Sequence, residues 1–242
     1  MLLRCFGSAG AFPVGGEPTT GYSLTAGDTE LQLDFGSGVF AKRSQMCGEK
    51  LPDAILLSHL HFDHMCDLLP YTYFLQKKGA GISVPPMRLF LPSGSDAAAE
   101  ALIDRTVFDV IHVVAGCKYS VGGLEITAAA GRHPAVSFMY KICGEGKSFV
   151  FTGDTNTAPS LEPFVSGSDI LLCDACFTQE EWTIDSSHLS AFLAASLAKM
   201  SGVKRLLLTH FAPGSDRKLL LSQAARMFPA VTLMRSGETY EL

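Results

Sequence analysis

Apolar positions along the chain recur with two periods, one typical of strands and one typical of helices. Short apolar runs bounded by turn-forming residues predict strands, whereas apolar residues three or four positions apart predict helices. The predicted strands are 2–6, 22–25, 31–35, 53–57, 87–91, 110–114, 124–129, 136–142, 148–152, 169–174, 204–208 and 230–234. The predicted helices are 37–45, 65–78, 95–103, 187–200 and 215–227.

The order of these elements predicts an α/β protein. Residues 22–25 and 31–35 form a predicted hairpin around Gly27 and Asp28, and the Gly- and Pro-rich segment 7–20 must be a loop. Strands and helices alternate after residue 150, which favours sheets inside and helices outside. Asp185, Ser186 or Ser187 is available to cap the helix predicted at 187–200. No repeat or linker divides the chain, so we expect a single domain over 1–242.

Composition and charge exclude several classes of protein. Hydrophobic residues make up 47% of the 242 residues and charged residues 18%, which excludes a disordered chain. The net charge of −5 argues against a surface adapted to nucleic acid. Apolar runs are too short for a membrane helix, and the apolar stretch at the N-terminus ends too early for a signal peptide. We therefore expect no membrane contact. The odd count of seven cysteines is typical of reduced thiols rather than disulfides, so we expect a cytoplasmic protein.

A dense polar motif follows the predicted strand 53–57 and indicates metal chemistry. Its spacing is His-x-His-x-Asp-His, formed by His59, His61, Asp63 and His64. A chance polar turn is the alternative, but imidazole and carboxylate together are ligands that suit Zn²⁺, with Mn²⁺ or Fe²⁺ as alternatives.

Three further polar residues stand at predicted strand ends. His133 lies between two strands, Asp154 follows the strand 148–152, and His210 follows the strand 204–208. Open α/β sheets place their sites at the carboxyl ends of strands. Each residue taken singly has an ordinary interpretation as a turn or as a satisfied polar group. Together with the motif at 59–64, they are candidate metal ligands.

The order of these residues resembles the metallo-β-lactamase-fold hydrolase superfamily, and the resemblance begins with Asp34 in Leu-Asp-Phe-Gly and continues to His210. It implies a four-layer αββα sandwich with two metals, expected as two Zn²⁺ per chain, at one edge. One metal would be held by His59, His61, His133 and Asp154, and the other by Asp63, His64, Asp154 and His210, with Asp154 bridging. Asp34 would orient the motif loop, as such ligands generally require.

Asp174 and His188 are similar to a pair in the ribonuclease Z branch and its smaller phosphodiesterase-like relatives. That branch usually carries Glu where this chain has Asp174. The resemblance implies that His188 protonates the leaving oxygen, that Asp174 fixes its tautomer, and that Asp63 orients the nucleophile. A helix N-terminus would disfavour the charged form of His188, whereas Asp174 would favour it, and the sequence does not determine which effect is larger.

The resemblance departs from ribonuclease Z at one place. True ribonuclease Z has a long arm for transfer RNA between the positions of His133 and Asp154, where this chain has only residues 134–153. The expected substrate is therefore a small phosphodiester, such as a cyclic nucleotide, rather than transfer RNA. The alternatives are a thioester or lactone hydrolase, ribonuclease Z-like RNA processing, and a metal-binding protein with lost or redox activity. Family members are often dimers, so a homodimer is also expected.

Several conspicuous residues have ordinary interpretations. Cys173 and Cys176 have the spacing of a redox or zinc pair, but we interpret them as core thiols because no second pair accompanies them. His112 has no motif around it and is interpreted as a surface or satisfied strand residue. Aromatic residues near the motifs are expected to pack in the core rather than line a pocket; they are Phe62, Phe177, Trp182 and Phe211.

Overall fold

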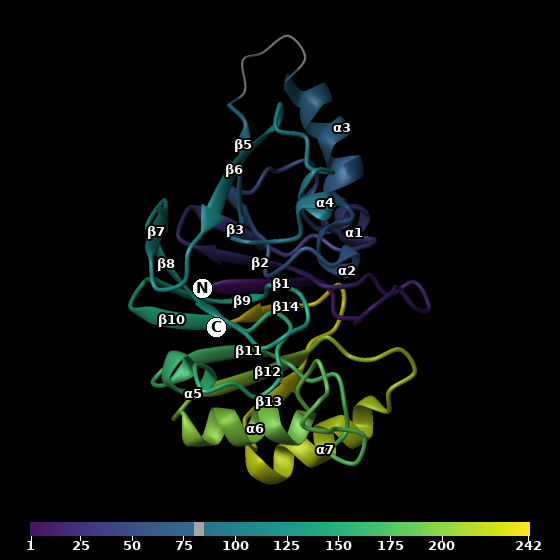
Figure 1. Cartoon of the computed structure of the whole chain (residues 1–242), viewed down its shortest axis with the longest axis vertical. Helices are drawn as coiled ribbons and strands as arrows, with labels where there is room; N and C mark the ends of the chain where they lie inside the picture. The colour runs from purple at the N-terminus through teal and green to yellow at the C-terminus, as the bar shows by residue number, and fades with distance from the viewer. Residues whose placement is uncertain (80–84) are drawn as a thin grey trace.

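The computed structural model describes residues 1–79 and 85–242, and its strands form two seven-stranded sheets (Figure 1). The first sheet joins the two ends of the chain, because the last strand pairs antiparallel with the first. From edge to edge it contains β14 (Thr239–Glu241), β1 (Leu2–Gly7), β2 (Gly21–Ala26), β3 (Thr29–Leu33), β4 (Ala54–Leu56), β5 (Met87–Pro92) and β6 (Phe108–Val113). The predicted hairpin is confirmed as β2–β3, and β3 to β6 run parallel.

The second sheet is also mixed. From edge to edge it contains β13 (Val231–Leu233), β12 (Arg205–Thr209), β11 (Ile170–Asp174), β10 (Lys147–Phe151), β9 (Phe138–Gly144), β8 (Leu124–Ala130) and β7 (Lys118–Val121). Strands β10 to β13 are parallel, whereas β7 to β10 form an antiparallel meander. Strand β8 therefore points the same way as β10, β11 and β12, and the carboxyl ends of all four strands share one edge.

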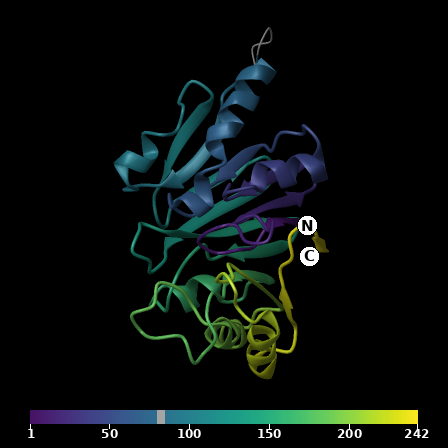
Figure 2. The same cartoon turned by 90° about the vertical axis from the view of Figure 1, so that its right-hand side faces the viewer.

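Helices cover the outer face of each sheet, so the predicted αββα sandwich is confirmed (Figure 2). One apolar cluster fills the space between the sheets and contains Leu24 and Tyr140. A second lies between the second sheet and the helices α5 (Leu161–Val165), α6 (Ala191–Met200) and α7 (Arg217–Met227). A third lies under α1 (Val39–Cys47), α2 (Phe62–Met65) and α3 (Leu68–Gly79). Among the described residues, no helix has the length and apolar character needed to cross a membrane.

The helix predicted at 65–78 begins only at Leu68, as α3, and its predicted first residue, Met65, ends the separate helix α2. Pro70 lies in the first turn of α3. Its backbone nitrogen carries no hydrogen, so it cannot donate a helical hydrogen bond to the preceding turn. A continuous helix would need that bond, so a new helix starts at Leu68. The break places Asp67 between the two helices, where its carboxylate accepts the backbone N–H of Phe40 at 2.8 Å. The short helix α2 is thereby held beside α1.

Two other helix predictions were too long. The helix predicted at 187–200 begins at Ala191, because Ser190 and not an earlier residue caps it by accepting the N–H of Leu193 at 3.1 Å. The helix predicted at 95–103 is the single turn α4 (Ala97–Glu100), followed by turns. The elements that the apolar pattern missed are all short: α2, α5, β7 and β14. Elements of three to five residues contain too few positions to show a period.

A buried ion pair links α1 to β3. The Arg43 guanidinium lies 2.7 Å from a carboxylate oxygen of Glu30, and both side chains are almost fully buried. Arg43 also donates to the Gln32 side chain at 3.1 Å and to the carbonyl oxygen of Lys50 at 3.0 Å. This arginine therefore forms one buried ion pair and two hydrogen bonds.

Replacing Arg43 with methionine is expected to lower the free energy of unfolding by about 3–5 kcal/mol, because it leaves the Glu30 carboxylate buried with only an exposed lysine beside it. Urea denaturation followed by circular dichroism measures the change. The control variant is Lys118→Ala, which removes an exposed pair with Glu125 and should leave the midpoint unchanged. Equal midpoints for all three proteins would contradict the prediction.

Candidate metal centre

The candidate site lies at the edge where parallel strands of both sheets end. The motif residues follow β4, and His61 is the N-cap residue of α2, which contains Asp63 and His64. His133 follows β8, while Asp154 and His210 follow β10 and β12. Residues from separate parts of the sequence therefore meet at one edge, as predicted from strand ends.

Three histidines form one group of converging ring nitrogens. His59, His61 and His133 each offer a ligand atom, and these atoms all lie within 4.8 Å of one another. The Nε2 atom of His133 is 3.1 Å from Nδ1 of His61. On the other side of its ring, Nδ1 of His133 donates to the carbonyl oxygen of Ser187 at 3.2 Å. Because a carbonyl oxygen only accepts, Nε2 is the unprotonated atom, and it faces the group.

Two carboxylates and two histidines form a second group beside it. The group contains Asp63, His64, Asp154 and His210, and its ligand atoms also lie within 4.8 Å of one another. The Oδ2 atom of Asp154 lies 3.2 Å from Nε2 of His64 and 3.3 Å from Nε2 of His210. The same oxygen is 3.6 Å from Nε2 of His59 in the first group. Asp154 therefore lies between the two groups, as its expected bridging role requires.

Three buried atoms of the cluster have no hydrogen-bond partner within residues 1–79 and 85–242. They are Nε2 of His59, Oδ1 of Asp154 and Nδ1 of His210. A buried polar atom without a partner is costly in free energy. Burial lowers the pKa of both His59 and His133, which favours the neutral imidazole that binds metal. The donor set therefore fits divalent cations.

The charge of the cluster leads to the same conclusion. In the described part of the chain, Asp34, Asp63, Asp154 and Asp174 pair with histidines and form no ion pair with lysine or arginine. Burial lowers the pKa of His64, but the neighbouring carboxylates of Asp154, Asp63 and Asp34 hold it well above its ordinary value. A site that draws a proton onto a buried histidine in this way also attracts a cation.

Asp34 lies behind the motif and fixes the ring of His64. Its Oδ2 atom accepts from Nδ1 of His64 at 2.8 Å, which leaves Nε2 free to face the cluster. The same carboxylate accepts the N–H of Ser58 at 2.6 Å and its hydroxyl at 2.8 Å. Asp34 has a φ of 51°, a conformation that few residues other than glycine adopt. Its hydrogen bonds orient the loop, in agreement with the role that the resemblance implies.

The second predicted pair lies beside the cluster. Asp174 ends β11, and its Oδ2 atom is 2.8 Å from Nδ1 of His188. Burial lowers the pKa of His188, but the Asp174 carboxylate, assisted by Asp154, raises it to about 9. The expected opposition from a helix N-terminus was wrong, because α6 begins only at Ala191 and a helix dipole acts within its first turn. His188 therefore holds a proton near neutral pH.

Residues of the N-terminal loop complete the site, and the motifs did not reveal them. The backbone N–H of Ala11 donates to Oδ2 of Asp63 at 2.8 Å. Gly10 lies against the ring of His210, and a Cβ atom at this position would be 2.8 Å from its Cε1. Only glycine allows this approach without a shift of the ligand ring. The Gly- and Pro-rich character of segment 7–20 predicted a loop but not its contacts.

The residues with ordinary interpretations divide into two kinds. His112 lies away from the cluster and pairs with Glu100 at 2.9 Å, as expected of a surface residue. Cys173 is packed in the core beneath α6, and burial raises the pKa of its thiol. Cys176 is also buried, but its sulfur lies within 4.8 Å of ring nitrogens of both His188 and His210. This thiol therefore belongs to the wall of the site rather than to the core alone.

Comparisons with known proteins agree with this geometry. A family model described as a β-lactamase superfamily domain matches residues 37–211. The ML1173 protein of Mycobacterium leprae is 33% identical over all of this chain and 87% of its own length. YhfI of Bacillus subtilis, a probable metallo-hydrolase, is 29% identical with both chains covered in full.

Solved structures show the same fold. The crystal structure of YhfI superposes with a TM-score of 0.91 over 99% of both chains, at 26% identity. The short form of human tRNase Z superposes with a TM-score of 0.76 over 100% of this chain and 99% of that one. The identity to human tRNase Z is 17%, so this similarity shows the fold alone.

Proposed function

The chain belongs to the metallo-β-lactamase superfamily, and on that premise we propose that it is a metal-dependent hydrolase of small phosphodiesters. The observation that carries the proposal is the contact of 2.8 Å between Asp174 and His188 beside the candidate metal cluster. A protonated histidine at this position can donate a proton to the leaving oxygen, which a phosphodiester with an alkoxide leaving group needs. We also propose a cytoplasmic location, which is supported by seven free cysteines.

We propose two zinc ions as the bound metals, because histidine nitrogens and carboxylate oxygens are the ligands that zinc prefers. The first would be held by His59, His61, His133 and Asp154, and the second by Asp63, His64, Asp154 and His210. When bound, such cations lower the pKa of a water molecule and offset the charge of the phosphoryl group.

The residues of the chain would donate and hold protons and would orient the attacking water. A water molecule would lose a proton to solvent and add its oxygen to phosphorus, the bond from phosphorus to the leaving oxygen would break, and that oxygen would take a proton from Nε2 of His188, which solvent then protonates again. Asp174 keeps Nδ1 of His188 protonated and turns Nε2 toward the substrate. Asp63, held in place by the N–H of Ala11, would orient the attacking water as well as bind metal.

A small substrate is favoured over RNA by the hairpin between His133 and Asp154. Strands β9 and β10 pair from Phe151 and Tyr140 as far as Lys147 and Gly144, so only Glu145 and Gly146 form the turn. The hairpin leaves no arm at the position where the ribonuclease Z branch carries one.

Assays on metal-loaded protein test the proposal. We expect bis(p-nitrophenyl) phosphate to be hydrolysed with a higher kcat/KM than any thioester or lactone in a panel of such substrates. Only the diester has both a phosphoryl group for the proposed metals and a leaving oxygen on phosphorus for His188. Addition of a chelator should abolish turnover, and re-addition of Zn²⁺ should restore it. Faster turnover of a thioester or lactone would favour that alternative. Activity that survives complete removal of the metal would contradict a metal-dependent mechanism.

A further inference from the structure

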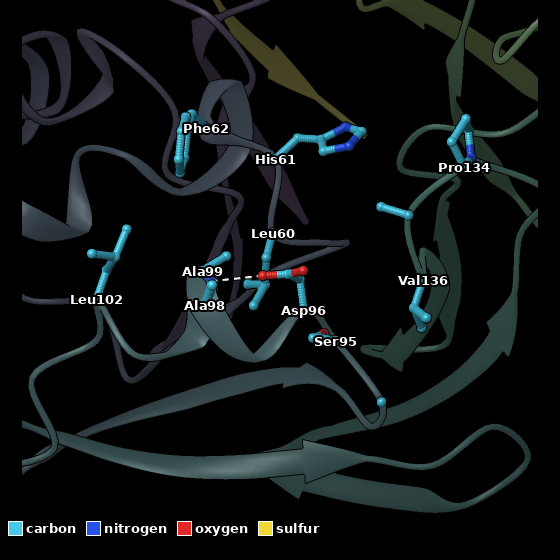
Figure 3. A pocket seen from close by; sticks show the side chains of 12 residues that line it. Leu60, His61, Phe62, Ser95, Asp96, Ala98, Ala99, Leu102, Pro134 and Val136 are labelled. Carbon is cyan, nitrogen blue, oxygen red and sulfur yellow. Dashed lines mark hydrogen bonds between the residues drawn. The ribbon is translucent and has the colours of Figure 1, made fainter.

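A hollow of about 640 Å³ opens beside the candidate metal cluster (Figure 3). Three separate segments surround it: the motif at 60–62, the turn region at 94–102 that contains α4, and residues 134–136 directly after His133. His61 belongs to both the hollow and the three-histidine group. The hollow is therefore continuous with the site, and its volume lies in the range of small-molecule pockets.

The walls of the hollow expose apolar side chains to solvent. Phe62 is 63% exposed, Leu102 is 44% exposed and Val136 is 42% exposed. The expectation that Phe62 packs in the core was thus wrong, because α2 turns its ring away from the third apolar cluster and toward this opening. Apolar side chains gathered around a concave opening typically mark a site of ligand contact.

The polar side chains of the hollow already have partners. The hydroxyl of Ser95 donates to the carbonyl oxygen of Pro92 at 2.7 Å. Asp96 caps α4 by accepting the N–H of Ala99 at 2.8 Å, and Figure 3 shows this carboxylate near the centre of the view. No lysine or arginine lines the hollow among the described residues. A second anionic group would therefore be repelled here, whereas an uncharged flat group would be accepted.

The lining also indicates which part of a substrate reaches the hollow. His188 must contact the leaving oxygen if it is the proton donor. Neither His188 nor Asp174 is among the described residues that line the hollow. The occupant is therefore a part of the substrate other than the leaving group.

We propose that this hollow, with Phe62, Leu102 and Val136 as its apolar contacts, binds an uncharged planar ester group that stays on phosphorus during cleavage. The proposal rests on the proposed phosphodiesterase function and defines its substrate class: diesters in which the retained group is an aromatic ring or a nucleobase. Phe62 supplies a ring face for stacking, and Leu102 and Val136 exclude water from the edges.

Two esters with the same leaving group test the proposal. Bis(p-nitrophenyl) phosphate retains an aryl group after cleavage, whereas methyl p-nitrophenyl phosphate retains only a methyl group. Leu102→Ala is expected to lower kcat/KM for the first by about tenfold, mainly through KM, and to leave the second unchanged. Ala98→Trp, which fills the hollow, should lower kcat/KM for the bis-aryl ester at least as much. The matched control is Leu69→Ala, a leucine of α3 that is 41% exposed outside the hollow and should change neither rate.

A binding measurement separates failure of the pocket from failure of the proposed function. Calorimetry on the metal-loaded protein should show weaker binding of phenyl phosphate to Leu102→Ala than to the wild type, and equal binding of methyl phosphate. Equal rate losses on both esters, or no loss in either pocket variant, would overturn the pocket assignment while the hydrolase function stands. If the metal-loaded wild type hydrolyses neither ester, the proposed function is overturned, and the assignment of a retained ester group to this hollow is overturned with it.

Discussion

Replacing His188 with alanine is expected to lower kcat by about 10²–10⁴-fold for a phosphodiester whose leaving group is a sugar hydroxyl. An alkoxide leaves poorly without a proton, and His188 is the protonated group held beside the cluster by Asp174. The loss should be far smaller for bis(p-nitrophenyl) phosphate, because p-nitrophenolate leaves readily without protonation. A nucleoside cyclic phosphate is a suitable probe for the first case.

The ratio of the two losses distinguishes a proton donor from a residue that only supports the fold. A structural defect would lower both rates alike, whereas a missing proton donor affects mainly the poor leaving group. Metal content should stay at the wild-type value in this variant. The matched control is His112→Ala, which removes a histidine of the edge strand β6 that pairs with Glu100 and belongs to neither ligand group. Equal losses on both substrates in His188→Ala would refute the acid role.

The α/β class of the fold and most of the candidate site could be predicted from short-range patterns in the sequence, whereas the four-layer sandwich was predicted only from the resemblance to the superfamily. Apolar runs such as 170–174 and 205–209 define strands wherever they occur, and ligands at strand ends must meet once parallel strands share an edge. The motif at 59–64 is similarly local. His133, Asp154 and His210 could thus be assigned to the site without knowledge of the strand order.

The remaining features depend on contacts between distant segments, which no local pattern encodes. The backbone N–H of Ala11 reaches Asp63 only because an isolated bridge links Ala9 to Phe211 and holds the N-terminal loop over the site. Cys176 lies beside His188 only because the chain returns to pair Phe177 with Ser190. The hollow beside His61 is likewise assembled from three segments, and none of them signals a pocket by itself.

Replacement of Asp154 with asparagine is expected to have the largest effect, because this residue lies between the two ligand groups. Its Oδ2 atom is within 3.2–3.6 Å of ring nitrogens of His64, His210 and His59, so one substitution weakens both metal positions. An amide keeps the size of the side chain but removes the negative charge that would offset the charge of bound cations. We expect kcat/KM to fall by about 10³-fold or more.

The graded comparison is Asp34→Asn, which alters a residue that holds Nδ1 of His64 but offers no ligand atom to either group. Removing such an outer contact typically costs about 10–100-fold in metal affinity or activity. Metal analysis by mass spectrometry should therefore give about two ions per chain for the wild type, a partial loss for Asp34→Asn and the greatest loss for Asp154→Asn. Circular dichroism should be unchanged, because the sheets that end at this edge are built on other residues. If Asp154→Asn retained two metals and full activity, the bridging role would be wrong. If Asp34→Asn lost more metal than Asp154→Asn, the loop that Asp34 orients, rather than the bridge, would control the site.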